Sequence, residues 1–228
     1  MRPLGNVLIT GGASGLGAAT VDAVRKAGGT PYVLDRVRPA DPAEYAEADL
    51  ADTAATERAV RDLAGRAGGL DGVFTAAGID SCGQLSEVDT DDWERVVKVN
   101  LLGTAAVVRA ALPYLERSHG TIVTCSSTLG IKAVSDATAY CASKFGVVGF
   151  TRALAAELAG RVGVTLLIPG GMWTPFFDNR TDQYKPPPDA KLNEPEHTAS
   201  TVVFALRQPP GSEVRELVVC ASEEGSWP

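Results

Sequence analysis

The chain has 228 residues, 45% of them hydrophobic, which suits one α/β domain with a substantial core. Its formal net charge is −7 and its sequence pI is about 4.9, with no basic run, so nucleic acid is not an expected partner. No apolar stretch is expected to reach membrane-spanning length and the first residues lack signal-peptide anatomy, so we expect a cytoplasmic protein with no membrane partner.

The cysteines and histidines give no metal-binding pattern. The four cysteines lack metal-ligand spacing, and neither His119 nor His197 lies near a cysteine pair. We therefore expect no metal site and four reduced thiols, as in a cytoplasmic protein. The cysteines are Cys82, Cys125, Cys141 and Cys220.

The first predicted strand, at 6–10, runs into a glycine-rich turn. Gly11, Gly15 and Gly17 belong to this turn, and a helical pattern follows from about residue 16 to 27. Glycines let the backbone approach a pyrophosphate, whose charge is met by N–H groups at the helix N-terminus. The arrangement predicts a phosphate-binding corner. A tight turn with a packing glycine is the simpler alternative.

The second predicted strand, at 31–34, ends in Asp35. An acidic residue about 20 positions after the glycine turn can accept hydrogen bonds from an adenosine ribose. It would also repel a 2′-phosphate, which favours NAD over NADP. Arg36 could receive such a phosphate, but we expect it to point away. The simpler interpretation of Asp35 is a turn residue.

The next predicted elements are a third strand at 43–48, a helix at 53–67 and a fourth strand at 70–75. Asp49 and Leu50 end the third strand and are expected to lie beside an adenine ring; a helix cap is the alternative for Asp49. The small residues that follow the fourth strand would leave space for a cofactor ribose. They are Ala76, Ala77 and Gly78.

A long helix is predicted from residue 91 to about 117, with Asn100 inside an apolar run. The amide has two interpretations. It could mark a kink that holds a water molecule for a proton relay, or it could be a core amide whose hydrogen bonds are satisfied within the protein.

The centre of the chain carries the clearest chemistry. Ser127 follows a buried strand at 121–125, and Tyr140 and Lys144 lie one turn apart on a predicted helix at 137–158. A tyrosine pKa is about 10, and lowering it by about three units requires roughly 4 kcal/mol. The lysine cation would supply part of this and an oxidised nicotinamide more. The stretch predicts a proton-transfer site; a buried tyrosine beside a surface lysine is the alternative.

The last third of the chain completes the alternation of strands and helices. A strand at 162–168 leads to Thr174, which with the preceding backbone could hold a nicotinamide carboxamide. Residues 175–195 are predicted as a small lid or a plain surface loop. A helix at 195–207 and a strand at 214–220 follow. Six or seven strands alternating with helices predict an α/β fold, a doubly wound parallel sheet with helices on both faces.

Together these motifs resemble the short-chain dehydrogenases/reductases in order and spacing, from residue 5 to about 220, including the 13-residue interval between serine and tyrosine. The matching positions are Thr10-Gly-x3-Gly15-x-Gly17, Asp35, Asp49, Ala76-Ala-Gly78, Asn100, Ser127, Tyr140-x3-Lys144 and Pro169-Gly-x3-Thr174. The resemblance implies a single Rossmann-type domain over 1–228 and reversible hydride transfer between a nicotinamide and a carbonyl or alcohol.

The resemblance also implies roles for particular residues. Tyr140 would be the general acid/base, Lys144 would lower its pKa and hold the nicotinamide ribose, Ser127 would orient the substrate oxygen, and Asn100 would anchor a relay water. The expected cofactor site comprises Gly11, Ser14, Gly15, Leu16, Gly17, Asp35, Arg36, Asp49, Leu50, Ala76, Ala77, Gly78, Tyr140, Lys144, Pro169, Gly170, Met172 and Thr174. Trp173, Phe176 and Phe177 would join Ser127 and Tyr140 around a partly apolar substrate.

The sequence departs from the family pattern in three places. Thr75-Ala76-Ala77-Gly78 replaces Asn-Asn-Ala-Gly, which removes an amide that helps stabilise the central sheet. The tail 221–228 replaces a glycine-rich one and the chain is short between 174 and 214, so the lid is small. Family members pair through the helices at about 91–117 and 136–159. We expect a homodimer, or a homotetramer with a smaller interface.

These observations predict an NAD-dependent oxidoreductase acting on a secondary alcohol or ketone. Two alternatives are a cofactor-binding regulator without turnover and an epimerase or dehydratase on the same fold. The intact Asn–Ser–Tyr–Lys set argues against the first. The absence of a substantial C-terminal substrate domain argues against the second.

Overall fold

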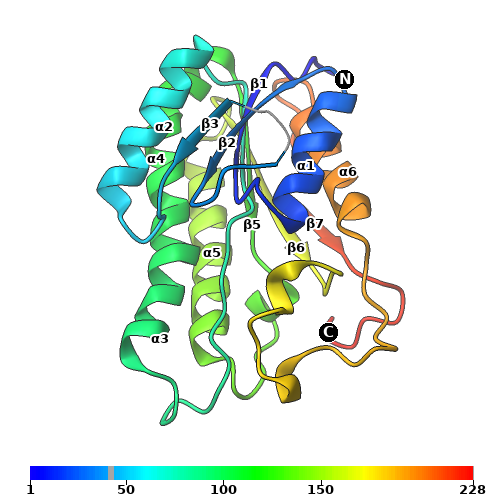
Figure 1. Ribbon diagram of the computed structural model, residues 1–228. Coiled ribbons are helices and arrows are strands. Elements are labelled where there is room, and N and C mark those ends of the chain that lie inside the picture. Colours follow the sequence, from blue (N-terminus) through cyan, green and yellow to red (C-terminus); the bar gives the residue numbers. More distant parts are fainter. Residues whose placement is uncertain (41–43, 228) are drawn as a thin grey trace.

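The computed structural model describes residues 1–40 and 44–227, which form a seven-stranded parallel sheet (Figure 1). Its strand order is β3-β2-β1-β4-β5-β6-β7, so the direction of winding reverses between β1 and β4. The predicted doubly wound parallel sheet is therefore confirmed. The strands are β1 (Asn6–Thr10), β2 (Thr30–Asp35), β3 (Glu44–Glu47), β4 (Gly72–Thr75), β5 (Thr121–Cys125), β6 (Gly163–Pro169) and β7 (Glu216–Val219).

Helices cover both faces of the sheet, α1 and α6 on one and α2, α4 and α5 on the other (Figure 1). Neighbouring strand residues supply the two faces in turn, because successive side chains point to opposite sides. In β1, Leu8 packs toward α2 and α4, whereas Val7 and Ile9 pack toward α1 and α6. The helices are α1 (Gly15–Lys26), α2 (Thr53–Ala67), α3 (Thr90–Val97), α4 (Thr104–Ser118), α5 (Thr138–Glu157) and α6 (Pro195–Leu206).

The predicted elements are all present, with differences at their ends. The third strand was predicted at 43–48 and spans Glu44–Glu47, with residue 43 outside the described residues. The fourth begins at Gly72 instead of residue 70, although Leu70 is buried. Burial in the core, rather than pairing in the sheet, explains the apolar residue at position 70.

One long helix runs without a break through α3, a π-helical turn η1 (Lys98–Gly103) and α4. This helix, Thr90–Ser118, has 29 residues and a mean hydropathy of 1.4 over its most apolar 18 residues. By length and composition alone it could cross a membrane, so the expectation that no stretch reaches that length was wrong. More than half of its most apolar window, 56%, is buried inside the protein. The helix packs against α2, α5 and the sheet, so its apolar residues serve the core of the domain.

Candidate active site

A cavity of about 680 Å³ lies at the carboxyl ends of β1, β4, β5 and β6. This is the edge of the sheet, beside the point where the winding reverses, at which open α/β sheets bind ligands. The cavity collects most of the predicted site from segments far apart in the sequence. The predicted residues that line it are Gly11, Ser14, Gly15, Leu16, Gly17, Ala76, Ala77, Gly78, Ser127, Tyr140, Lys144, Gly170, Met172, Thr174, Phe176 and Phe177.

The other predicted residues lie outside the cavity lining. Trp173 differs most from its expected place: its side chain is 40% exposed, and its backbone N–H donates to the carbonyl oxygen of Asn193 at 2.9 Å. Trp173 is therefore not among the described residues that line the cavity, and its backbone pairs with residue 193 instead. The remaining predicted residues outside the lining are Asp35, Arg36, Asp49, Leu50, Asn100 and Pro169.

The glycine-rich corner has the geometry that an anionic group requires. Gly11 and Gly15 have φ angles of 69° and 51°, in the left-handed region that glycine adopts without strain. A Cβ atom on Gly17 would lie 2.0 Å from the carbonyl oxygen of Gly11, so the loop and helix α1 touch backbone to backbone. Ser14 precedes α1 without a side-chain cap, and the first turn holds no acidic residue. The helix N-terminus therefore keeps its positive end free for a phosphate.

Asp35 ends β2 beside this corner. Its carboxylate accepts hydrogen bonds from the backbone N–H groups of Ala13 at 3.0 Å and Val37 at 3.1 Å. Arg36 next to it is exposed. The negative charge is therefore fixed against the glycine loop, where an adenosine ribose would lie in a Rossmann-type site.

Asp49 is anchored by two donors. Burial alone would raise its pKa, but the Ala51 N–H at 3.0 Å and the Arg95 guanidinium at 2.7 Å outweigh that effect and lower the pKa. The helix-cap interpretation of Asp49 is wrong, because Asp52 caps α2 by accepting from the Ala55 N–H. Leu50 is buried against Gly103.

The serine, tyrosine and lysine meet at the cavity. Helix α5 carries Tyr140 and Lys144, and the Lys144 Nζ lies 5.5 Å from the centre of the tyrosine ring and donates to the Cys125 carbonyl at 2.9 Å. Ser127 follows β5, and its hydroxyl, which accepts from the Leu129 N–H at 3.1 Å, acts to lower the pKa of Tyr140. All three side chains are buried in the protein yet line the cavity, so a phenol, a hydroxyl and an ammonium face the same space.

The pKa of Tyr140 is raised, which is opposite to the expected direction. Burial is the largest cause, the Cys125 thiol adds to it, and the hydrogen bond with Ser127 opposes it. Burial likewise lowers the pKa of Lys144. The lysine cation was expected to supply only part of the lowering, and around Tyr140 desolvation outweighs the groups that favour the phenolate. A raised pKa favours the protonated phenol, the form that can donate a proton.

Asn100 lies in the π-helical turn, and its side-chain amide is fully engaged. Its Nδ2 donates to the Ile79 carbonyl at 2.9 Å and to the Ser143 Oγ at 3.0 Å, while its Oδ1 accepts from the Ile79 N–H at 2.8 Å. These bonds are those of the core amide in the second interpretation, while the π-helical turn is a helix irregularity like the kink of the first; the relay water stays a prediction. It ties the loop after β4 to helix α5. A Cβ on Gly78 would lie 3.4 Å from the Lys144 Nζ and 3.5 Å from the Asn100 Oδ1, in ordinary contact with both, so Gly78 lies beside these two side chains.

Sequence reasoning missed two groups of cavity residues. Arg180, from the segment after β6, donates to the Asp80 carboxylate at 2.6 Å across 100 positions of sequence. The C-terminal tail also reaches the cavity: the Glu224 carboxylate accepts from the Gly171 N–H at 2.9 Å, and Ser226 hydrogen-bonds Thr128 at 2.6 Å. Neither contact follows a local pattern, so no sequence signal pointed to them.

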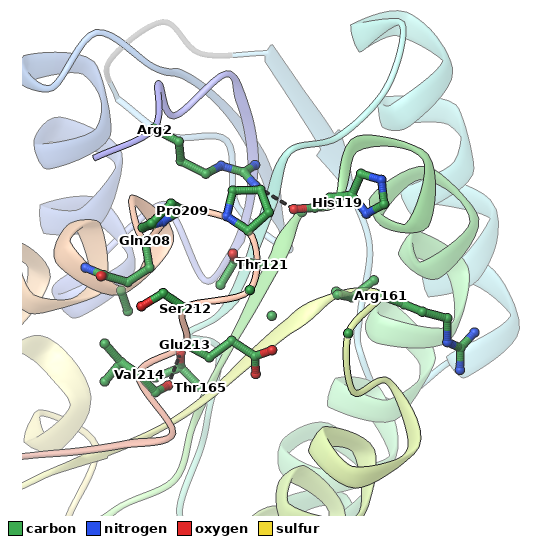
Figure 2. Close-up of a pocket in the computed structure, with 17 residues that line it drawn as sticks. Arg2, His119, Thr121, Arg161, Thr165, Gln208, Pro209, Ser212, Glu213 and Val214 are labelled. Atoms are coloured by element: carbon green, nitrogen blue, oxygen red, sulfur yellow. Dashed lines mark hydrogen bonds between the residues drawn. The ribbon is translucent and has the colours of Figure 1, made fainter.

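A second, smaller cavity lies at the opposite ends of β5 and β6 (Figure 2). Its volume is about 30 Å³, room for about one or two water molecules. In Figure 2 the Arg2 side chain reaches across to the His119 carbonyl, and the Thr165 hydroxyl donates to the Val214 carbonyl at 2.7 Å. These contacts close the N-terminal end of the sheet, and the space is too small for a substrate.

A parallel sheet with a glycine-rich corner and a buried serine–tyrosine–lysine site defines a Rossmann-type oxidoreductase. Residues 5–185 match the family model described as short chain dehydrogenase. The chain therefore belongs to the short-chain dehydrogenase/reductase family, as its motifs indicated.

Individual relatives agree with this assignment. The chain is 33% identical over 209 residues to a short-chain dehydrogenase/reductase, ABA4, of Pyricularia oryzae, covering 82% of this chain and 76% of the relative. It is 35% identical over 182 residues to a 2-dehydro-3-deoxy-L-rhamnonate dehydrogenase (NAD(+)) of a Sphingomonas species, covering 75% and 73%. The crystal structure of levodione reductase superposes with a TM-score of 0.85 at 27% identity, covering 96% of this chain and 97% of that one.

Proposed function

We propose that this chain is an NAD-dependent oxidoreductase that interconverts a secondary alcohol and a ketone, with Tyr140 as the general acid/base. The observation that carries the proposal is the meeting of Ser127, Tyr140 and Lys144 at a cavity whose other end is the glycine-rich corner. Proton transfer and phosphate binding are then available in one space.

The residues present fit a nicotinamide dinucleotide. The close backbone approach at Gly17 and the uncapped start of α1 suit a diphosphate. Thr174 lies against the same loop, because a Cβ added to Gly15 would be 3.3 Å from the Thr174 Cβ. When bound, the nicotinamide supplies or accepts the hydride. The residues proposed to hold the cofactor are Gly11, Ser14, Gly15, Leu16, Gly17, Asp35, Asp49, Leu50, Ala76, Ala77, Gly78, Lys144, Pro169, Gly170, Met172 and Thr174.

Asp35 supports NAD over NADP. Its carboxylate is held at the glycine loop by two backbone N–H groups, so it cannot swing away from an incoming phosphate without losing both. An added 2′-phosphate would meet a fixed negative charge there. The Sphingomonas relative, whose name specifies NAD(+), is in keeping with this preference.

The proton step follows from the three polar groups at the cavity. In reduction, Tyr140 gives its phenolic proton to the carbonyl oxygen that the Ser127 hydroxyl holds; in oxidation the phenolate takes the proton back. Lys144, whose Nζ lies 5.5 Å from the centre of the Tyr140 ring, favours the phenolate electrostatically. We assign Asn100 a positioning role, because its amide holds Ile79 and Ser143 beside these groups.

The substrate space and the assembly complete the proposal. The Phe176 ring lies 5.6 Å from the Tyr140 ring, which supports a partly apolar substrate beneath a lid formed by residues 175–195.

Leu102 and Phe145 are 47% and 44% exposed on the helices that we propose to pair in a homodimer or homotetramer. We propose a cytoplasmic enzyme with a single domain.

The decisive experiment is Tyr140→Phe with a panel of ketones and NADH, followed at the nicotinamide absorbance. Loss of the proton donor is expected to lower kcat by a factor of about 100–10,000 while NADH binding stays unchanged. Tyr114→Phe is the matched control, because Tyr114 lies on α4, away from the cavity. A kcat near that of the wild type for Tyr140→Phe would exclude the proposed role.

A further inference from the structure

An ion pair forms part of the wall beside the proposed proton donor. Arg180 donates to Asp80 at 2.6 Å, and the exposed fractions of the two side chains are only 18% and 4%. The Arg180 guanidinium also lies 5.2 Å from the Phe176 ring centre and 4.7 Å from that of Phe177. Phe176 in turn lies against Tyr140. The pair therefore belongs to the same wall as the aromatic residues that face the reacting groups.

Both members of the pair are held in place by further contacts. Arg180 donates from its second terminal nitrogen to the Tyr184 carbonyl at 3.1 Å. Asp80 accepts from the Ser81 N–H at 2.7 Å and from the Cys82 thiol at 3.2 Å. Tyr184 is itself tied through its hydroxyl to Asp136 at 3.2 Å. The arginine is thus fixed over the cavity, and its charge is cancelled where it stands.

The charges around the cavity sum to zero. Among the described residues that line it, the charged side chains are the acids Asp80 and Glu224 and the bases Lys144 and Arg180. Lys144 donates to the Cys125 carbonyl and is one of the residues proposed to hold the cofactor, and Glu224 accepts from the Gly171 N–H and from Ser226. Apart from Lys144, an anionic substrate group entering this space would meet no cation without a carboxylate partner, so losing its hydration would be costly, whereas a neutral polar group would lose far less.

We propose that the Asp80–Arg180 pair makes the substrate wall electrically neutral and so selects uncharged ketones and alcohols over carboxylate-bearing ones. This inference rests on the proposed function, since it concerns the substrate of the same site. Asp80 is the specificity-determining residue, because without it Arg180 would present an unpaired cation beside the reacting carbon. The Asp80–Arg180 pair selects by disfavouring carboxylate-bearing substrates, and removing Asp80 is expected to reverse the preference for uncharged ones.

The test compares levulinate with levulinamide, two ketones of nearly equal size that differ in charge. The wild type is expected to have the higher kcat/KM for levulinamide. In Asp80→Asn the kcat/KM for levulinate divided by that for levulinamide is expected to rise about tenfold or more, because Arg180 can then pair with the substrate carboxylate. In Arg180→Gln the ratio should fall below that of the wild type, since the Asp80 anion is left unpaired.

Two controls separate charge from shape. The double variant Asp80→Asn/Arg180→Gln keeps side chains of similar size without charge, and its ratio is expected to return to within about threefold of the wild type. Glu44→Gln removes an exposed partner of Arg66, with which Glu44 pairs at 3.0 Å away from the cavity, and should leave the ratio unchanged. A wild type that prefers levulinate, or an Asp80→Asn ratio within twofold of the wild type, would overturn the inference.

A binding measurement keeps this test separate from the proposed function. Valerate and valeramide, which cannot be reduced, are titrated calorimetrically into the NAD complexes of the wild type and of Asp80→Asn. Tighter binding of valeramide to the wild type, with reversal in Asp80→Asn, supports the neutral wall even if no ketone is turned over. If the ratio of the Kd values for valerate and valeramide is the same in the two proteins, the neutral wall is refuted, whether or not a ketone is turned over. Absence of turnover with every ketone would instead count against the proposed function.

Discussion

Gly17→Ala tests whether backbone contact builds the cofactor corner. A Cβ at this position would lie 2.0 Å from the Gly11 oxygen and 2.5 Å from the Gly11 carbon, both backbone atoms that no side-chain rotation can move. Separating the Cβ from the oxygen by the usual 3 Å or more requires the loop to shift by about 1 Å. Such overpacking costs about 1–3 kcal/mol, and the better helix propensity of alanine returns only about 1 kcal/mol.

The expected result has two parts. The Tm of Gly17→Ala should fall by a few degrees, since about 1 kcal/mol corresponds to roughly 2–4 °C for a chain of this size. The Kd for NADH, measured by fluorescence titration, should rise about tenfold or more, because the shift moves the N–H groups that face the phosphates. Both effects come from one displacement of the loop, so they should appear together.

Gly65→Ala is the matched control within α2. This glycine is exposed, and an added Cβ would meet nothing within 4 Å. The same substitution should therefore raise the Tm by roughly 2–4 °C and leave the Kd for NADH unchanged. If Gly17→Ala binds NADH as tightly as the wild type, the reasoning from backbone contact to a phosphate cradle is refuted.

Three further predictions concern the rest of the site. Asp35→Ala should narrow the preference for NAD over NADP in kcat/KM by about tenfold; a wild type that uses NADPH better than NADH would contradict the assignment. Because burial raises the pKa of Tyr140, alcohol oxidation should accelerate as pH rises from neutral to alkaline while ketone reduction stays nearly flat; oxidation fastest in acid would count against this. Glu224→Gln replaces an acceptor of the Gly171 and Ser226 hydrogen bonds, and it should raise the substrate KM about threefold to tenfold in steady-state assays; an unchanged KM would remove the tail from the site.

Much of the fold could be predicted because its signals are local. Continuous apolar runs such as 121–125 are typical of strands covered on both faces, and the glycine turn after β1 requires a positive φ that few other residues adopt. The ends of strands were less certain, as Leu70 shows, because a residue can be buried without pairing in the sheet. The sequence analysis found no stretch of membrane-spanning length and so overlooked the long helix at 90–118, whose composition alone cannot tell a protein interior from a lipid one.

The candidate site also contains residues that could be predicted from local sequence spacing and residues that could not. Tyr140 and Lys144 could be found from their spacing of four on one helix, and Ser127 from the end of the preceding strand. Arg180 and Asp80 could not, because their contact depends on how a segment 100 positions further along folds back over the cavity. The rise in the Tyr140 pKa was missed for a different reason, since desolvation depends on every group packed around the phenol and not on the nearest charge alone.

The residues proposed to move the proton and the residues proposed to select the substrate lie on different parts of the chain. The proposed proton-transfer groups are positioned by the helix repeat of α5 and by the end of β5, which do not depend on the distant segments. The walls come from the segment around Arg180 and from the tail that contains Glu224, which are joined to the scaffold by a few polar contacts. Charge changes confined to those contacts should therefore alter which ketone reacts without altering how the proton moves. Asp80→Asn tests this separation directly, because it changes the wall and leaves Ser127, Tyr140 and Lys144 in place.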